Sequence, residues 1–169
     1  MQAQKLFKTF KKDINIDISE VTLLSAEEAE ALLTSLQRAT YPLWWWLRSP
    51  GSGPNCVAYV YSNGTVFTYG SSVLDINHGV RPALRICNPG PSDLVPGESF
   101  EAGGERWTLI SDDLALCDRI VGKSAFRTDY KAPYANDYEK SDVKKWLENW
   151  ALERDLYTTA QLERMQGRA

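Results

Sequence analysis

Apolar and polar positions alternate with a period of two through much of the first half of the chain. The clearest stretch is VAYVYSNGTVFTY at 57–69, where two alternating runs flank Asn63 and Gly64. Asn-Gly between such runs is a strong signal for a hairpin with a two-residue loop. That loop would place Ala58, Val60 and Phe67 on one face of the hairpin, and Tyr59, Tyr61, Val66 and Thr68 on the other.

The rest of 44–86 has the same β-character, and GVRPALRI at 79–86 is expected to form one further strand. Pro82 should sit at a bulge or an edge of that strand, because proline cannot donate to a β-ladder. Two short strands are expected in ERWTLI and LALCDRI, after the Pro- and Gly-rich stretch CNPGPSDLVPGESF.

A period of 3.6 residues appears in three places. Residues 25–37 are expected to form a helix that starts at a capping box, Ser25 with Glu28. Residues 141–154 carry apolar side chains at helical spacing, with Trp146 and Trp150 on the apolar face. A last helix is expected to open at Thr158.

These elements predict one α+β domain over 1–169. Its lobes would be 17–87 and 97–154, joined by a linker at 88–96, with a C-terminal helix in 155–169. Neither lobe has enough apolar surface for a core of its own, so the 141–154 helix is expected to pack on the 25–37 helix or on a shared sheet.

The amino-acid composition gives no support to several classes of function. The formal net charge is −3 and the pI is about 5.3, which gives no electrostatic footprint for nucleic acid. No run is apolar enough to span a bilayer, and no signal peptide is visible, so a cytoplasmic protein is expected. Three cysteines and one histidine provide neither a disulfide framework nor a zinc motif, and no cofactor is expected.

The N-terminal segment leaves two alternatives. Leu6, Phe7 and Phe10 form a short apolar stripe beside four lysines. A helix docked on the body of the protein and a helix on a membrane surface both fit this pattern, and the docked helix is favoured.

The motifs WWWLRSPG, AYVYSNGTV and GVRPALRI resemble an uncharacterised domain family that is common in Firmicutes genomes and their phages. FEAGGERWTLI and YEKSDVKKWLENW are similar to the opening strand and first helix of that family, but here they follow GVRPAL. The resemblance therefore implies a circular permutant in which 97–152 folds back onto 17–87.

The GVRPAL ending is also similar to the close of C-type-lectin-like and formylglycine-generating-enzyme-like domains. This resemblance implies a lectin-like fold in which loops carry the ligand contacts. It also implies a link to variable proteins of diversity-generating retroelements, whose loop residues are rewritten on a constant framework.

Three consecutive tryptophans cannot share one face of a flat strand. Trp44 and Trp46 are expected to be structural, and Trp45 to line a binding surface; the alternative is that all three are core residues at a sheet–helix junction. Arg48 and Arg81 are interpreted as structural arginines that join loops through several donors. Gly64 and Trp146 complete the structural set.

The stretch 52–78 is rich in Tyr, Ser and Asn, which are typical of adaptable binding loops and also of ordinary turns. The predicted binding patch consists of Tyr59, Tyr61, Thr68, Tyr69, Asp75, Asn77 and His78, beside Trp45.

Three functions remain open. The first is a non-catalytic module that binds a protein or glycan ligand. The second is a structural protein of a phage or mobile element, which could be virion-associated. The third is an enzyme, although no spacing in the sequence supports a catalytic set of Cys56, His78 and Asp75. Asp75 and Asn77 alone provide too few oxygen ligands for a calcium site.

Overall fold

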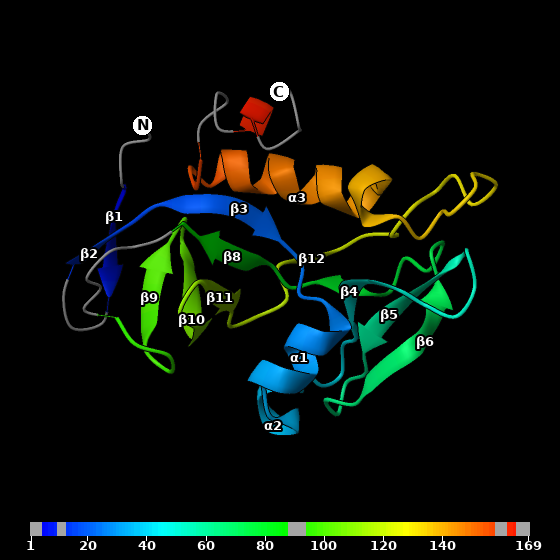
Figure 1. Ribbon diagram of the computed structural model, residues 1–169, viewed down its shortest axis with the longest axis horizontal. Coiled ribbons are helices and arrows are strands. Elements are labelled where there is room, and N and C mark those ends of the chain that lie inside the picture. The colour runs from blue at the N-terminus through cyan, green and yellow to red at the C-terminus, as the bar shows by residue number, and fades with distance from the viewer. Residues whose placement is uncertain (1–4, 10–12, 88–93, 158–161, 165–169) are drawn as a thin grey trace. The chain divides into compact units, whose positions relative to one another are not determined.

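The computed structural model describes residues 5–9, 13–87, 94–157 and 162–164 (Figure 1). The chain divides into two compact units, each assembled from separate stretches. Unit 1 comprises Met1–Thr22, Ala83–Asp118 and Glu148–Ala169, and unit 2 comprises Leu23–Pro82 and Arg119–Leu147. The division therefore does not follow the lobes 17–87 and 97–154, because each unit draws on both.

Unit 1 is built on a seven-stranded sheet in the order β2-β1-β9-β10-β11-β8-β3, with antiparallel neighbours throughout. Its strands are β1 (Lys5–Thr9), β2 (Asp13–Ile16), β3 (Ile18–Thr22), β8 (Ala83–Ile86), β9 (Ser99–Ala102), β10 (Glu105–Ser111) and β11 (Leu114–Cys117). Strands from the second half of the chain thus lie between strands from the first half.

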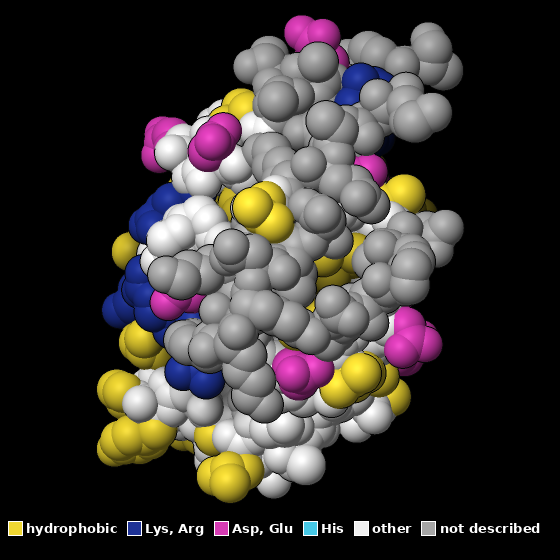
Figure 2. All heavy atoms as spheres, turned by 90° about the vertical axis from the view of Figure 1, so that its left-hand side faces the viewer, with side chains coloured by type: hydrophobic (Ala, Val, Ile, Leu, Met, Phe, Trp, Pro, Cys, Tyr) yellow, Lys and Arg dark blue, Asp and Glu magenta, His cyan; other side chains and the backbone are white. Residues whose placement is uncertain are grey.

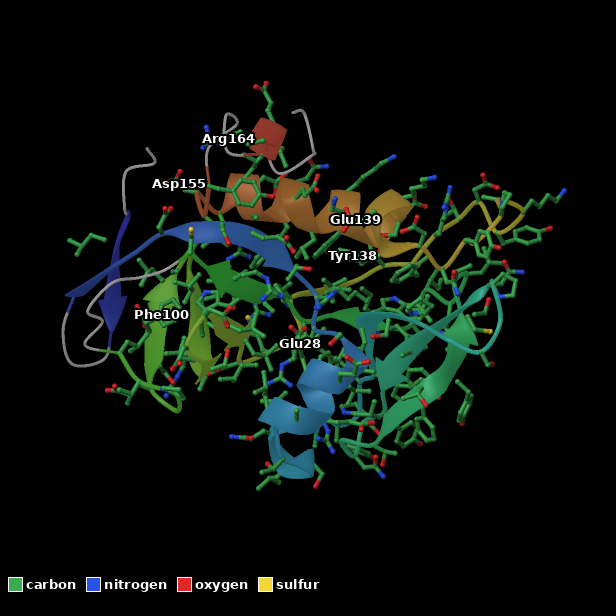
Figure 3. All side chains as sticks on the ribbon, viewed as in Figure 1. Glu28, Phe100, Tyr138, Glu139, Asp155 and Arg164 are labelled. Atoms are coloured by element: carbon green, nitrogen blue, oxygen red, sulfur yellow. The ribbon has the colours of Figure 1, made fainter. Side chains whose placement is uncertain are left out.

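The core of unit 1 centres on Trp107, which is fully buried on β10 and donates its indole N–H to the Ala102 carbonyl over 2.9 Å. Phe100 of β9 lies opposite it across the ladder and is also fully buried (Figure 3). Trp150 of helix α3 (Asp142–Glu153) packs edge to face with Trp107. Burying such large rings is the main stabilising contribution to this unit.

Unit 2 holds a five-stranded sheet in the order β12-β7-β4-β5-β6, in which β4 and β7 are parallel and the other neighbours antiparallel. Its strands are β4 (Trp45–Pro50), β5 (Cys56–Val60), β6 (Val66–Ser72), β7 (Gly79–Val80) and β12 (Gly122–Lys123). The half-buried Trp146 of α3 packs on β12, because a Cβ at Gly122 would lie 2.6 Å from its ring. Trp146 is therefore a packing residue of this unit.

Unit 2 contains two short helices, and each begins at a capping box. Helix α1 (Ala26–Leu32) begins at the predicted box of Ser25 and Glu28, and α2 (Ser35–Arg38) begins at a second box formed by Thr34 and Gln37. The expected continuous helix over 25–37 is wrong because Leu33 and Thr34 adopt extended geometry between the two. A Thr-x-x-Gln sequence offers the backbone a new helix start at that point.

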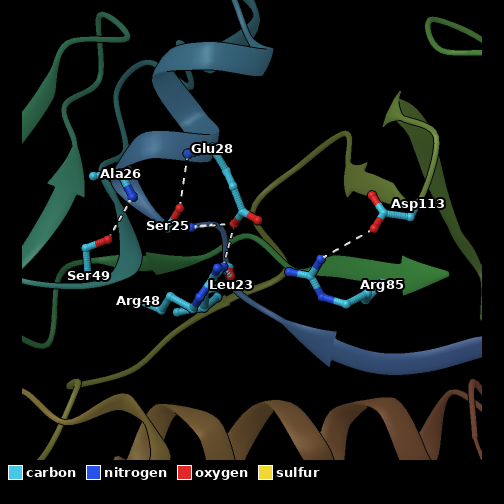
Figure 4. Close-up of polar contacts among 8 residues, drawn as sticks. All are labelled: Leu23, Ser25, Ala26, Glu28, Arg48, Ser49, Arg85 and Asp113. Atoms are coloured by element: carbon cyan, nitrogen blue, oxygen red, sulfur yellow. Dashed lines mark hydrogen bonds and ion pairs between the residues drawn. The ribbon is translucent and has the colours of Figure 1, made fainter. Parts of the chain in front are cut away.

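The LRSP sequence of β4 anchors the start of α1 (Figure 4). The guanidinium of Arg48 donates to the Leu23 carbonyl over 2.7 Å and to the Glu28 carboxylate over 2.5 Å. The Ser49 hydroxyl accepts the Ala26 N–H over 2.9 Å. Arg48 is thus placed as a structural residue, and it holds Glu28 in its capping geometry.

Figure 4 also shows an ion pair within unit 1, between Arg85 of β8 and Asp113, at 3.9 Å. Both side chains are partly exposed, so this pair contributes little to stability.

Arg81 and Arg38 connect the helices of unit 2 to its sheet. Arg81 is buried, lies over the Trp45 ring and donates to the Gln37 carbonyl. Arg38 donates to the carbonyls of Leu33 and Gly64, and its own carbonyl accepts the Trp45 indole N–H over 3.0 Å. These arginines therefore fasten α2 to the Trp45 face of the sheet.

The N-terminal helix expected near Leu6 is wrong, since 5–9 and 13–16 pair as the β1–β2 hairpin. The period-two run of isoleucines at 14, 16 and 18 is the signal for strands in this region. The single strand expected for GVRPALRI is also wrong. Pro82 and Arg81 separate β7 from β8, which belong to different sheets.

The expected α+β, C-type-lectin-like fold is therefore incorrect. The structure consists mainly of β-strands in two sheets, whereas α1, α2 and α3 have only 7, 4 and 12 residues. The N-terminal stretch that suggested a helix forms strands, and the stretch 25–37 forms two short helices, whereas the helix expected at 141–154 is present as α3. The helix expected from Thr158 lies largely outside the described residues. The part of it that is described, 162–164, is helical.

No helix within the described part of the chain is long and apolar enough to cross a bilayer. In the space-filling view of Figure 2, hydrophobic, basic and acidic side chains occur side by side on the described part of the surface.

Candidate functional site

One face of the unit 2 sheet is lined by aromatic rings from successive strands. We define this aromatic face as Trp44, Trp46, Tyr59, Tyr61, Phe67, Tyr69 and His78. Strand pairing explains the grouping, because Trp46 lies opposite Tyr59, and Tyr59 lies opposite Phe67. Directly opposed residues of an antiparallel pair share a face, so the rings form a row across β4, β5 and β6.

The rings pack edge to face and face to face. Trp44 stacks on Tyr59 with centroids 5.2 Å apart and contacts Tyr61 at 4.8 Å. Phe67 stacks on Tyr59 at 5.3 Å, and Tyr69 meets the Phe67 ring at 5.4 Å. These spacings fall in the favourable range for aromatic pairs, and they hold each ring in a defined orientation.

His78 lies at the closed end of the row. Its ring is fully buried, stacks on Trp46 at 4.1 Å and meets Trp44 and Tyr59 edge-on. Its Nδ1 lies 3.3 Å from the Asp75 carboxylate, but the atoms are poorly aligned for a hydrogen bond, and Nε2 has no hydrogen-bond partner among the described residues. Burial lowers the pKa of His78, and the nearby carboxylate of Asp75 only partly offsets this effect.

The segment 124–138 covers the Trp46 end of the face. The Trp46 indole donates to the Ser124 carbonyl over 2.8 Å, and Phe126 packs its edge against the Trp46 ring. Tyr138, at the start of the short 3-10 helix η1 (Tyr138–Lys140), lies next to Phe126 (Figure 3). Trp46 and His78 are thereby withdrawn from solvent.

The other end of the aromatic face is open. Trp44, Tyr61 and Phe67 are half-buried, and Tyr69 is 57% exposed. We call these four side chains the open rings. They present aromatic surface to solvent from a rigid, hydrogen-bonded sheet.

The hairpin register differs from the expected one by one residue. The Tyr61 N–H donates to the Thr65 carbonyl, the Gly64 N–H donates to the Tyr61 carbonyl, and Gly64 has a φ of +92°. The loop thus has three residues and ends in a glycine bulge, rather than two. A slip of one residue moves alternate side chains to the other face, so Phe67 joins the tyrosines and Thr68 leaves them.

Three residues of the predicted binding patch are therefore misplaced. Tyr59 is only 7% exposed, because rings pack on it from both sides, and His78 lies beneath it. Trp45 is fully buried on the opposite face against Arg81. Trp44, which was expected to be structural, is the tryptophan that reaches the surface.

Other members of the patch lie as expected at the surface. Tyr61 and Asp75 are half-buried, and Tyr69, Thr68 and Asn77 are exposed, although Thr68 lies off the aromatic face. Asp75 accepts the Asn77 N–H over 2.9 Å within the loop that follows β6. Of the predicted patch, Tyr61 and Tyr69 both pack against Phe67, and Asp75 lies 3.3 Å from His78 of the same aromatic face.

Sequence reasoning missed Trp44, Phe67, Leu74 and Ile76 as surface residues of this region. Leu74 is 43% exposed and Ile76 is 69% exposed, on either side of Asp75. The correct hairpin register would have revealed Phe67. The sequence VLDI at 73–76 does not distinguish the exposed Leu74 and Ile76 from the buried Val73.

The chemistry available at the open end consists of stacking and hydrogen bonding. Burial raises the pKa of Tyr59, and Tyr69, Tyr61 and Asp75 raise it further, so its hydroxyl remains a donor at neutral pH. Within the described residues, no three of the His, Cys, Asp and Glu side chains are arranged to hold a metal ion. Cys56, Cys87 and Cys117 are free thiols.

His78 should make stability depend on pH. Because the folded state lowers its pKa, the unfolded chain binds a proton first, and stability should fall as the pH drops below about 6.5. The loss can reach about 1.4 kcal/mol per pH unit until the folded-state pKa is passed. We expect urea unfolding between pH 7.5 and 5 to show a smaller loss for His78→Phe, which keeps a ring on Trp46. Parallel curves for both proteins would contradict this.

Comparison with known proteins completes the picture of the site. Neither a curated protein nor a solved structure gave a match to the chain. A family model described as "Domain of unknown function (DUF6273)" matches residues 2–87, a span that contains all seven residues of the aromatic face. The matched residues make up just over half of the chain, and the chain therefore belongs to the DUF6273 family.

Proposed function

We propose that the chain is a non-catalytic binding module that engages a protein partner through the open rings of unit 2. The observation that carries the proposal is the set of four aromatic side chains, Trp44, Tyr61, Phe67 and Tyr69, held in fixed stacking geometry at the surface. Tyr and Trp provide large contact area at low entropic cost, and they dominate the energetics of interfaces.

The distribution of exposed apolar side chains favours a macromolecular partner. Within the described residues, the most exposed large hydrophobic side chains in unit 1 are only Leu6 and Val95. Those in unit 2 are Leu36, Tyr41, Tyr69, Leu74, Ile76, Tyr130 and Tyr134. Of these, Tyr69 is one of the open rings, and Leu74 and Ile76 lie in the loop that follows β6. Exposed apolar side chains that gather in this way mark interaction surfaces.

A protein partner suits the surface better than a glycan. Sugars stack on flat aromatic rings, so a glycan would need only the open rings for binding. Leu74 and Ile76 extend the surface with aliphatic side chains, which bury apolar area mainly against other proteins.

A binding role also accounts for His78 better than catalysis does. The ring is fully buried between Trp46, Trp44 and Tyr59, so it stiffens the aromatic face from below. A general base must come within hydrogen-bonding reach of its substrate, and a ring covered in this way presents no edge to solvent.

Selection from a random peptide library tests this proposal. We expect the full-length protein to enrich a set of peptides that the double variant Tyr61→Ser/Tyr69→Ser binds at least tenfold more weakly, because each ring buries apolar area worth about 1–2 kcal/mol on contact. Tyr59 is left unchanged, since it is buried and its loss would disturb the fold.

Leu36→Ser is the matched control. Leu36 is 85% exposed on α2, which is fastened to the opposite face of the sheet. The control should bind the selected peptides as the wild type does. The proposal fails if no peptide is enriched, or if the double variant keeps full binding while its near-ultraviolet circular dichroism is unchanged.

A second candidate function is a structural component of a phage or mobile element, with or without diversified loops. Sequences of sibling copies of this gene separate the two. Under the binding proposal, substitutions should gather at 52–78 and spare Trp45, Arg48, Gly64 and Arg81, each of which makes structural contacts. Substitutions spread evenly over the surface would favour the structural role, and a neighbouring reverse transcriptase gene would favour retroelement diversification.

A further inference from the structure

Asp75 is the one charged residue between 49 and 80, a stretch that contains most of the aromatic face. It lies in the loop between β6 and β7, and its side chain is 27% exposed. One carboxylate oxygen accepts the Asn77 N–H over 2.9 Å, and the other lies 3.3 Å from His78. The carboxylate also acts on Tyr59, because its charge contributes to raising the pKa of that hydroxyl.

Among the described residues, the carboxylate has no cationic counterpart. No Lys or Arg of the described chain forms an ion pair with Asp75. His78, which lies 3.3 Å from the carboxylate, is kept neutral at physiological pH because burial lowers its pKa. The negative charge of Asp75 is therefore stabilised mainly by water.

A partner that covers the open rings also covers this carboxylate. Asp75 lies 3.3 Å from His78, whose ring meets Trp44 and Tyr59 edge-on. Leu74 and Ile76 flank Asp75 in the chain and are exposed. Withdrawing a carboxylate from water is costly unless the incoming surface supplies a positive charge or several hydrogen bonds. Charge complementarity thus restricts which partner can bind.

We propose that the surface formed by the open rings and Asp75 recognises an arginine side chain, flanked by apolar residues, on the partner protein. This rests on the proposed function and specifies its partner. A guanidinium pairs with a carboxylate through parallel N–H groups and stacks on Tyr and Trp rings, so one side chain satisfies both features. Leu74 and Ile76 accept the apolar neighbours of that arginine.

Titration of the ¹⁵N-labelled full-length chain with two tripeptides tests the inference. The probes are acetyl-Leu-Arg-Leu-amide and its citrulline counterpart, which has a similar shape but no charge. We expect the arginine peptide to shift the amide signals of Tyr61, Tyr69 and Asn77 and the indole signal of Trp44. The citrulline peptide should bind about tenfold more weakly, as expected for loss of one charge-assisted contact.

Asp75→Asn should reduce binding of the arginine peptide by a similar factor and remove its sensitivity to salt. The variant keeps the oxygen that accepts the Asn77 N–H. Asp137→Asn is the matched control, because Asp137 is also half-buried in unit 2 and accepts the N–H two residues further on. It should leave the affinity unchanged.

The inference is overturned if both peptides bind equally, or if Asp75→Asn binds the arginine peptide fully. The proposed function still stands in that case, provided that library peptides need Tyr61 and Tyr69 for binding. Absence of binding by either peptide, together with library peptides that lack arginine, overturns it in the same way. Failure of the library selection itself counts against the proposed function.

Discussion

Replacing Arg81 with alanine should lower the free energy of unfolding by about 2–4 kcal/mol, which is typical of breaking a buried charged contact. Arg81 is only 6% exposed, lies 5.0 Å from the centroid of the Trp45 ring and donates to the Gln37 carbonyl over 3.1 Å. Alanine would leave this carbonyl without the guanidinium and one face of a buried tryptophan without packing. Urea unfolding followed by tryptophan fluorescence measures the loss.

Arg81→Lys and Arg106→Ala separate the contributions. Lysine keeps the charge but cannot stack as a planar fork, so most of the loss should remain. Arg106 is 57% exposed and pairs with Asp118 at the surface of unit 1, and its removal should change stability by at most about 0.5 kcal/mol. A loss for Arg81→Ala no larger than that for Arg106→Ala would show that the Arg81 side chain is solvated.

Local signals in the sequence located several elements well. The Ser25 and Glu28 capping box marks the start of α1, and helical spacing predicted α3 to within a residue at each end. Such features depend on neighbours in the chain, so a single sequence contains them.

Pairing between distant strands could not be predicted in the same way. GVRPALRI has the composition of one strand, yet Pro82 divides it between two sheets whose other strands come from remote stretches. The N-terminal lysines and phenylalanines suggested a helix, whereas pairing of β1 with β9 decides the outcome. Tertiary context overrides local propensity most easily in strands.

The candidate site shows how much depends on one residue of loop length. Tyr61, Tyr69 and Asp75 were predicted at the surface from composition and alternation alone. The two-residue loop assumed for Asn63-Gly64 then placed Phe67 on the wrong face and Tyr59 in solvent. Both two-residue and three-residue loops accept Asn-Gly, so the dipeptide identifies the hairpin without deciding its register.

Gly64→Ala should destabilise the protein by about 2–4 kcal/mol, because it combines backbone strain with overpacking. Gly64 has a φ of +92°, which an L-residue adopts only with strain. A Cβ there would also lie 2.0 Å from the Ser35 carbonyl oxygen, so α2 or the hairpin would have to move. The loss of unfolding free energy is measured by urea denaturation.

Two other glycines separate strain from steric conflict. Gly97 has a φ of +98° and Gly53 an ordinary one, and nothing lies within 4 Å of a Cβ at either position. Gly97→Ala should cost about 1 kcal/mol through strain alone, and Gly53→Ala should be neutral or slightly stabilising. If Gly64→Ala costs no more than Gly97→Ala, α2 does not press on the hairpin loop. If it costs distinctly more, the contact with Ser35 holds the three-residue loop in place, and with it the register that gathers the open rings on one face.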